Sequence, residues 1–206
     1  MESRTIQGME NVQLGDDVLW ADTLKGDAEA FGLLYDRHRG RVFRHAYRLA
    51  GGRHDAEDAT ATAFLELWRR RERVRLVGGS ILPWLLVTTT NTARNLQRAR
   101  VRHRRLLDAI PRLGEAEAEL DPALSNHDQS MNDEVAQALA VLKPLDLRLI
   151  SLVVFEELPL PAAAEAVGIS PGAAKVRMHR ARQKLKAALP RSLHHLHSPA
   201  LKGDPS

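Results

Sequence analysis

No cysteine occurs among the 206 residues, and aromatic residues make up only 4% of them. Disulfides and cysteine-based zinc sites are therefore excluded, and a reducing compartment is the natural location. With so few aromatic side chains, the cores must pack mainly through Ala, Leu and Val, which favours helices over sheets. We expect an all-α protein.

Long apolar runs are also absent. None approaches the roughly 20 residues that a membrane-spanning helix needs, so we expect no membrane insertion. The N-terminal stretch MESRTIQGMENVQLGDD is polar and does not resemble a signal peptide. These observations predict a cytoplasmic protein in which residues 1–13 form a disordered tail.

Motifs of the common enzyme classes are missing as well. The sequence has no Gly-rich phosphate loop, no Ser-His-Asp spacing and no CxxC motif. Asp55, Glu57 and Asp58 are candidate metal ligands or catalytic carboxylates, but helix N-termini favour acids without any chemistry. The HHLH segment at 194–197 is a candidate metal site in what we predict to be a solvated tail. We expect no enzyme, no cofactor and no metal.

Helical periodicity dominates the first half of the chain. Apolar residues recur at helical intervals over residues 16–49, with a break at Gly26. The following helix, HDAEDATATAFLELWRRRERV, has acids in its first turn and arginines near its end, which suits the helix macrodipole. After the loop RLVGGS, Ser80 is the expected cap of a further helix. Together these elements predict one small helical domain over residues 14–106.

Between Asp108 and Glu134 the composition changes. This stretch holds eight acids and one base, together with Pro and Gly. It predicts a flexible acidic linker, placed at 107–131, between the first domain and a second small helical domain at 132–190. A second disordered tail is predicted at 191–206.

The second domain contains a helix-turn-helix pattern, LPAAAEAVGISPGAAKVRMHRARQKL. Gly168 can take the positive φ that ends the first helix, and Ile169 is expected to lie between the two helices. Ser170 is a good N-cap, and Pro171 suits the first helical position. We therefore expect a second helix that begins at this turn.

That second helix is strongly basic. From Gly168 to Leu189 there are six Lys or Arg and no acid. One arc of the helix is apolar and is expected to face the preceding helices: Ala174, Met178, Ala181, Leu185, Ala188 and Leu189. The opposite arc is expected to enter a DNA major groove: Lys175, Val176, His179 and Arg180, with Gln183 and Lys186 beside them. Phosphate contacts are expected from Arg177, Arg182 and Lys184. The alternative is a solvated amphipathic helix, but the turn and the Ala-rich first helix favour DNA binding.

A second nucleic-acid surface is predicted on the helix that follows Ser80. Six arginines without a neighbouring acid would repel one another unless an anion binds: Arg94, Arg98, Arg100, Arg102, Arg104 and Arg105. Poor helix formers on the same helix suit hydrogen bonding to bases or sugars: Thr88, Thr89, Thr90, Asn91, Thr92 and Asn95. Trp84 is either a stacking platform for an unpaired base or a core residue.

The ordered set of these segments resembles the extracytoplasmic-function (ECF) sigma factors of bacterial RNA polymerase, over residues 14–189. The stretch 26–70 is similar to the polymerase-binding part of that family, PWLLVTTTNTARNLQRARVRHRR to its promoter-melting helix, and residues 160–189 to its helix-turn-helix. The resemblance implies binding to the β′ clamp helices and the β flap of core polymerase. It also implies binding of the −35 duplex, capture of melted −10 bases and an anti-sigma partner.

The resemblance assigns residues to each role. Polymerase binding is expected from Asp55, Glu57, Asp58 and Thr62. Binding of the −10 element and melting are expected from the loop 74–80 and from Ser80, Trp84, Asn91, Arg94, Asn95, Arg98 and Arg102. Binding of the −35 duplex is expected from Lys175, Val176, Arg177, His179, Arg180 and Arg182. The chain has Ala59-Thr60-Ala61-Thr62 where the family usually has a Leu-Val-Gln-Glu-like run, which predicts altered polymerase contacts.

A different function class remains open from the residues alone. The alternative is a helix-turn-helix regulator with an N-terminal dimerisation or sensing domain. The arginine-rich surface at 94–105, joined by an acidic tether, favours the sigma factor, because a dimeric regulator needs no single-strand surface. An antagonist of polymerase is a third hypothesis, but it would not need the upstream DNA-binding helix.

Overall fold

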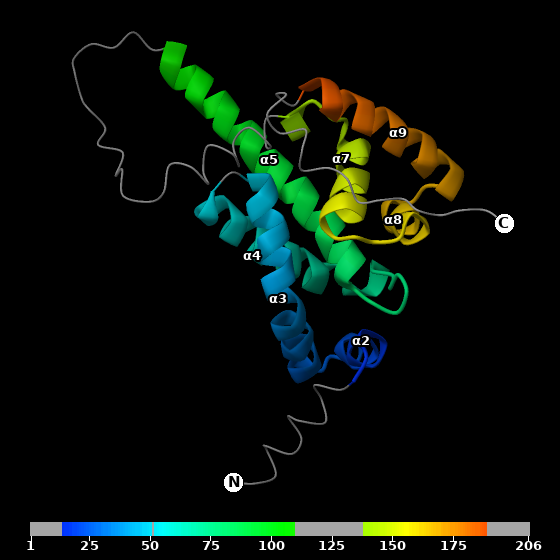
Figure 1. The fold of residues 1–206 in the computed structure, drawn as a ribbon. Helices are drawn as coiled ribbons and strands as arrows, with labels where there is room; N and C mark the ends of the chain where they lie inside the picture. Colours follow the sequence, from blue (N-terminus) through cyan, green and yellow to red (C-terminus); the bar gives the residue numbers. More distant parts are fainter. Residues whose placement is uncertain (1–13, 51, 110–137, 189–206) are drawn as a thin grey trace, which may run out of the picture.

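The computed structural model describes residues 14–50, 52–109 and 138–188, and this part of the chain is helical (Figure 1). The helices are α2 (Asp16–Leu24), α3 (Ala28–Ala50), α4 (Arg53–Arg69), η1 (Arg71–Arg73), α5 (Leu82–Ala109), α7 (Pro144–Ile150), η2 (Ser151–Phe155), α8 (Leu160–Val167) and α9 (Pro171–Ala188). The predicted all-α fold is confirmed. The predicted tails, the HHLH segment and most of the predicted linker lie outside the described residues, whereas α5 continues to Ala109.

Helices α3, α4 and α5 pack together to form the N-terminal unit. Ala56, Ala59 and Ala63 form a stripe along α4 that is fully buried. Such small side chains let α4 approach its neighbours closely. On the outer side, Phe31 lies edge-on to Trp68 with 5.0 Å between the ring centroids, which ties α3 to α4. No helix of the described residues combines the length and apolarity needed to cross a bilayer.

Helices α7, η2, α8 and α9 form the smaller C-terminal unit. Gly168 has φ 75°, the left-handed conformation expected at the end of α8. The Ser170 hydroxyl then accepts a hydrogen bond from the backbone N–H of Ala173 at 3.3 Å, so Ser170 caps α9 as predicted. Ile169 is half-buried and contacts the core. The helix-turn-helix is thus built on the residues that predicted it.

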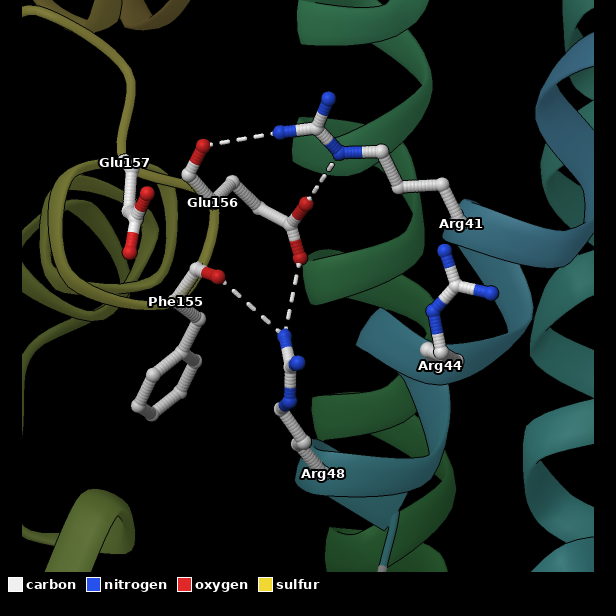
Figure 2. Close-up of a pocket in the computed structure, with 6 residues that line it drawn as sticks. All are labelled: Arg41, Arg44, Arg48, Phe155, Glu156 and Glu157. Carbon is white, nitrogen blue, oxygen red and sulfur yellow. Dashed lines mark hydrogen bonds and ion pairs between the residues drawn. The ribbon is translucent and has the colours of Figure 1, made fainter.

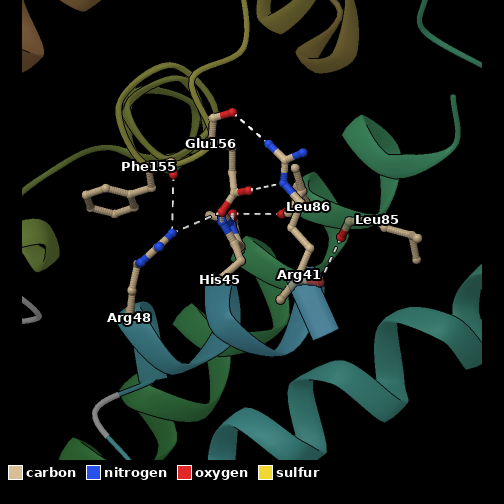
Figure 3. A network of polar contacts seen from close by, with 9 residues as sticks. Arg41, His45, Arg48, Leu85, Leu86, Phe155 and Glu156 are labelled. Carbon is tan, nitrogen blue, oxygen red and sulfur yellow. Dashed lines mark hydrogen bonds and ion pairs between the residues drawn. The ribbon is translucent and has the colours of Figure 1, made fainter. Parts of the chain in front are cut away.

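The two units pack on each other, which the sequence did not indicate. Helix α5 lies between α3 and α4 on one side and α7 and α8 on the other (Figure 1). Nη2 of Arg94 donates to the carbonyl of Leu142 at 3.2 Å. The buried carboxylate of Glu156, at the end of η2, faces basic side chains of α3 (Figure 3). The described helices therefore form one joined body.

Candidate nucleic-acid interface

The outer side of α9 presents the side chains that were predicted to contact a DNA groove. We call this surface the α9 basic face and define it by Lys175, Val176, His179, Arg180 and Arg182. All five are exposed, and even the apolar Val176 is 51% exposed. No hydrogen bond or ion pair joins these side chains to other described residues. Since Ala174, Met178 and Ala181 are buried on the opposite side, as predicted, the helix is fixed with the α9 basic face outward. The rest of the predicted apolar arc differs: Leu185 is half-buried, Ala188 is exposed, and Leu189 lies outside the described residues.

Arg177, predicted to contact phosphate, has a second role in the structure. Its Nη1 lies 2.9 Å from Oδ1 of Asp146, whose side chain is only 8% exposed. This ion pair joins α9 to α7. Arg177 nevertheless stays 40% exposed, and a guanidinium has five donor hydrogens, so donors remain for a phosphate.

The predicted −10 loop ends in a tight turn before α5. The backbone groups of Val77 and Ser80 exchange two hydrogen bonds, of 3.0 and 3.2 Å. Gly78 and Gly79 fill the corner with φ of 59° and 76°, values that L-residues with a Cβ seldom adopt. The Ser80 hydroxyl accepts a hydrogen bond from the N–H of Leu82, which makes Ser80 the cap predicted for this helix.

Asp16 of α2 holds this loop in place through hydrogen bonds. Its Oδ2 accepts hydrogen bonds from the Ser80 hydroxyl at 2.5 Å and from the N–H of Ile81 at 3.2 Å. The same carboxylate contacts Nε2 of His38 at 2.7 Å and Nη1 of Arg37 at 2.8 Å. Burial alone would raise the pKa of Asp16, but hydrogen bonds from its three side-chain partners outweigh burial and hold the pKa well below its usual range. A buried, ionised carboxylate therefore joins α2, α3 and the loop.

The residues predicted on α5 are placed unequally. Asn95, Arg98 and Arg102 are exposed. Asn91 is half-buried beside them. Arg94 is also half-buried, and its pKa is lowered, first by burial and then by the nearby charges of Arg98 and Arg148. Arg94 thus lies at the junction with the C-terminal unit, on the margin of the predicted surface.

Two expectations about α5 need correction. Thr89 and Thr90 are buried, with 0% and 1% of their surface exposed, so they form no base-binding surface. Their hydroxyls donate to the carbonyls one turn earlier, at 2.8 Å each, which satisfies them within the helix. The arginines are also not all unpaired, because Arg100 forms an ion pair with Asp55.

Trp84 is half-buried and packs against the core, which favours a role in the core over a role as a stacking platform.

The residues predicted to bind polymerase lie along α4 but differ in availability. Glu57 pairs with Arg53 at 2.9 Å on the surface, and Asp58 is exposed. Asp55 is largely buried by its ion pair with Arg100. Thr62 is half-buried. Within the described part of the chain, no three His, Cys, Asp or Glu side chains are grouped as a metal site requires.

Three buried polar residues were missed by the sequence reasoning. Asp16 was taken only as the start of a helix, and His45 and Glu156 were not singled out. All three are at most 8% exposed. Helical periodicity marks apolar faces and gives no signal for a polar side chain whose partner lies far away in the chain.

Comparison with known proteins matches both units. Residues 34–103 match the family model Sigma-70 region 2, and residues 132–185 match Sigma-70, region 4. The chain is 34% identical to the RNA polymerase sigma factor NccH of Alcaligenes xylosoxydans xylosoxydans, over 84% of this chain and 94% of NccH. It is 32% identical to the ECF RNA polymerase sigma factor SigE of Mycolicibacterium smegmatis, over 74% of this chain and 59% of SigE. The chain belongs to the sigma-70 family, in its ECF group.

The sigma factor also resembles a solved structure. The CnrH chain, solved in complex with the cytosolic domain of CnrY, aligns with a TM-score of 0.57 and 26% identity. The alignment covers 84% of this chain and 95% of the CnrH chain. In contrast, the sigma factor spans less than two thirds of the length of SigE. The match of the N-terminal unit to region 2 decides against the alternative of a regulator with an unrelated dimerisation or sensing domain.

Proposed function

We propose that this sigma factor binds core RNA polymerase, directs it to promoters through their −35 and −10 elements, and assists DNA melting. The observation that carries the proposal is the α9 basic face, which is exposed and unpaired among the described residues while its helix is anchored by a buried opposite side. A basic helix held in this way after a tight turn is the arrangement that enters a major groove in helix-turn-helix proteins. Arg177 and Arg182 would contact the phosphates beside the groove.

The −10 element would be bound by the loop 74–80 and the exposed side of α5. Asn91 and Asn95 can hydrogen-bond unpaired bases, and Arg98 and Arg102 can neutralise phosphates of the melted strand. We assign Ser80 a supporting role here, because its hydroxyl is already used by Asp16 and by the N–H of Leu82. A loop fixed by a buried carboxylate would offer a preformed binding surface.

Core polymerase is the partner we propose for the exposed side of α4. Asp58 and Glu57 would face the β′ clamp helices, with Thr62 beside them, while region 4 would contact the β flap. The sigma factor itself would make or break no bond, since RNA synthesis belongs to polymerase, and its place would be the cytoplasm. An anti-sigma factor is a further proposed partner, in line with the complex of CnrH with the cytosolic domain of CnrY.

Abortive transcription with purified core polymerase tests this function. Core polymerase with the full chain, on a library of genomic fragments, is expected to yield short RNAs that begin at defined sites. Core polymerase alone is the control. RNA that appears only after another sigma factor is added would show that the chain is a regulator, and would contradict the proposal.

Variants separate the two DNA surfaces in the same assay. Arg180→Ala is expected to weaken binding to the −35 duplex by about 1–3 kcal/mol, because it removes a groove contact. The double change of Asn91 and Asn95 to Ala is expected to leave duplex binding intact and to reduce melting, measured by permanganate footprinting. Arg53→Ala on α4 is the control for loss of one exposed arginine. Normal melting in the double variant would remove these asparagines from the −10 surface.

A further inference from the structure

We propose that Glu156 holds this sigma factor in a closed resting arrangement, in which regions 2 and 4 cannot occupy both promoter elements at once. This inference concerns regulation of the proposed DNA-binding surfaces and therefore rests on the proposed function. It starts from a side-chain contact between residues 111 positions apart in the sequence, at the junction of the two units.

The carboxylate of Glu156 lies against basic side chains of α3 (Figures 2 and 3). Nε of Arg41 donates to its Oε2 at 2.7 Å, and Nδ1 of His45 lies 2.9 Å from its Oε1. Nη1 of Arg48 is 3.2 Å from Oε1 and also donates to the carbonyl of Phe155 at 3.2 Å. Nη2 of Arg41 donates to the carbonyl of Glu156 itself at 2.8 Å. Three basic residues, one helical turn apart along α3, thus converge on a single residue of region 4.

Burial makes this contact dependent on charge. The Glu156 side chain is only 3% exposed, and His45 is fully buried. Burial alone would raise the pKa of Glu156, but the hydrogen bonds from His45 and Arg41, together with their charge, lower it. Charge-assisted hydrogen bonds in such surroundings are stronger than neutral ones. Removing the carboxylate charge would leave the basic side chains of α3 facing one another without an anion.

The backbone directs Glu156 toward α3. Its N–H donates to the carbonyl of Ser151 at 3.2 Å, the wide spacing of the π-helical turn η2. The next residue, Glu157, has φ 55°, an uncommon conformation for a residue with a side chain. The chain turns there, and Glu157 is left exposed while Glu156 is buried. Short π-helical turns and left-handed residues are features that often occur at functional positions.

The remaining junction combines apolar and polar contacts. Helices α7 and α8 and the turn η2 contact α5, and the apolar core continues from one unit into the other. Beside it, Arg94 donates to the carbonyl of Leu142. Contacts between domains of this kind open more readily than a domain unfolds. The Glu156 contact is therefore expected to set the fraction of molecules in which the two units are separated.

In the closed arrangement, regions 2 and 4 are held too close together to bind both promoter elements. The −35 and −10 elements are about 25 base pairs apart, or roughly 80 Å at 3.4 Å per pair. In the closed chain, regions 2 and 4 both pack along α5, whose 28 residues span about 42 Å. The helix along which both regions pack is therefore only about half as long as the distance between the two promoter elements. Binding to both elements requires the Glu156 contact to break.

The α9 basic face remains exposed in the closed arrangement, which allows a specific test. Binding of an isolated −35 duplex should not depend on opening, whereas binding of a full promoter with core polymerase should. A ligand that needs the open state binds more weakly by the fraction of molecules that are open. Changing Glu156 should therefore raise the affinity for a full promoter with core polymerase and leave the affinity for an isolated −35 duplex unchanged.

Opening is measured on the full chain without polymerase. Because the chain has no cysteine, Glu29→Cys on α3 and Ala187→Cys on α9 give two unique positions for fluorescent dyes. Glu156→Gln is expected to lower energy transfer, with at least a tenfold fall in the ratio of closed to open molecules, or about 1.4 kcal/mol. Glu157→Gln, which removes the same charge one residue later, should leave the transfer as in the unchanged chain. Equal transfer in all three proteins would overturn the proposal.

A second pair of variants tests the same contact from α3. Arg48→Gln should also open the molecule, whereas Arg44→Gln should not. Arg44 lines a pocket together with Arg41, Arg48 and Glu156 but makes no hydrogen bond or ion pair with other described residues (Figure 2). Should Glu156→Gln fail to fold, as judged by thermal unfolding, this pair decides the question. Opening by Arg44→Gln to the same extent as by Arg48→Gln would overturn the role of Glu156, because it would show only a general loss of positive charge.

Transcription then separates this inference from the proposed function. With core polymerase at limiting sigma concentration, Glu156→Gln should increase start-site-specific RNA several-fold over the unchanged chain, while affinity for an isolated −35 duplex stays the same. Activity of the unchanged chain without any gain in the variant overturns the closed resting state and leaves the proposed function standing. If neither protein yields start-site-specific RNA but Glu156→Gln still lowers energy transfer, the proposed function is overturned. The role of the Glu156 contact in holding the two units together then still stands.

Discussion

Regions 2 and 4 are built from similar apolar residues but prepare their DNA surfaces in different ways. In region 2 the −10 loop is held by a buried carboxylate of α2 that also contacts α3, so the site depends on partners far apart in the chain. In region 4 the α9 basic face needs only a cap, a left-handed glycine and three buried small or flexible side chains. The fixed loop of region 2 depends on long-range polar contacts, whereas the exposed face of α9 depends mainly on local ones.

The largest expected effect comes from removing the polar centre of region 2. Asp16→Asn should lower the free energy of unfolding by about 2–4 kcal/mol, because it leaves the buried His38 and the partly buried Arg37 without their anion. Urea unfolding followed by circular dichroism measures this change. Asp17→Asn, at an exposed position of the same helix, is the matched control. Equal stability of the two variants would show that the carboxylate does not hold region 2 together.

This contrast explains how much the sequence could predict. The turn at Gly168, the cap Ser170 and the burial of Ala174, Met178 and Ala181 on α9 were predicted, because each depends on residues within a few positions of one another.

The partners of buried polar groups could not be predicted in this way. Asp16 reaches Ser80 across 64 positions, and Glu156 reaches His45 across 111. No local pattern encodes such a pair. Threonines at 89 and 90 were misjudged because a poor helix former can satisfy its hydroxyl on the preceding turn and remain buried. The assignment of individual residues to polymerase and DNA contacts stays a prediction.

Acid should affect both units through their lowered carboxylate pKa values. A carboxyl group with a lower pKa in the folded state contributes stability that is fully present above its unfolded pKa, about 4, and is lost as the pH falls below it. We expect the free energy of unfolding to be nearly constant between pH 7 and 5 and to fall steeply below about 4. Asp16→Asn should flatten this fall, because it removes one of the two carboxyl groups, Asp16 and Glu156, that have a lowered pKa among the described residues. An unchanged pH profile in the variant would contradict the ionised state of Asp16.

A smaller effect is expected at the turn of region 4. Gly168→Ala should cost about 1–2 kcal/mol, because φ of 75° is strained for any residue with a Cβ. No atom lies within 4 Å of the position of the added Cβ, so the cost is conformational. Gly172→Ala within α9 also meets no atom and should be neutral or stabilising. Thermal unfolding that ranks these two variants in the opposite order would show that the turn does not limit region 4.

The smallest effect distinguishes the two roles of Arg177. Its half-exposed ion pair with Asp146 should contribute about 0.2–1 kcal/mol, so Arg177→Gln and Asp146→Asn should destabilise the protein alike. Their DNA binding should differ. If Arg177 also neutralises a phosphate, Arg177→Gln lowers the slope of log K against log salt by about 1, and Asp146→Asn does not. Equal slopes for both variants would show that Arg177 serves only the packing of α9. Region 4 would then use one basic residue of its predicted DNA surface for an internal contact, as region 2 does with Arg94.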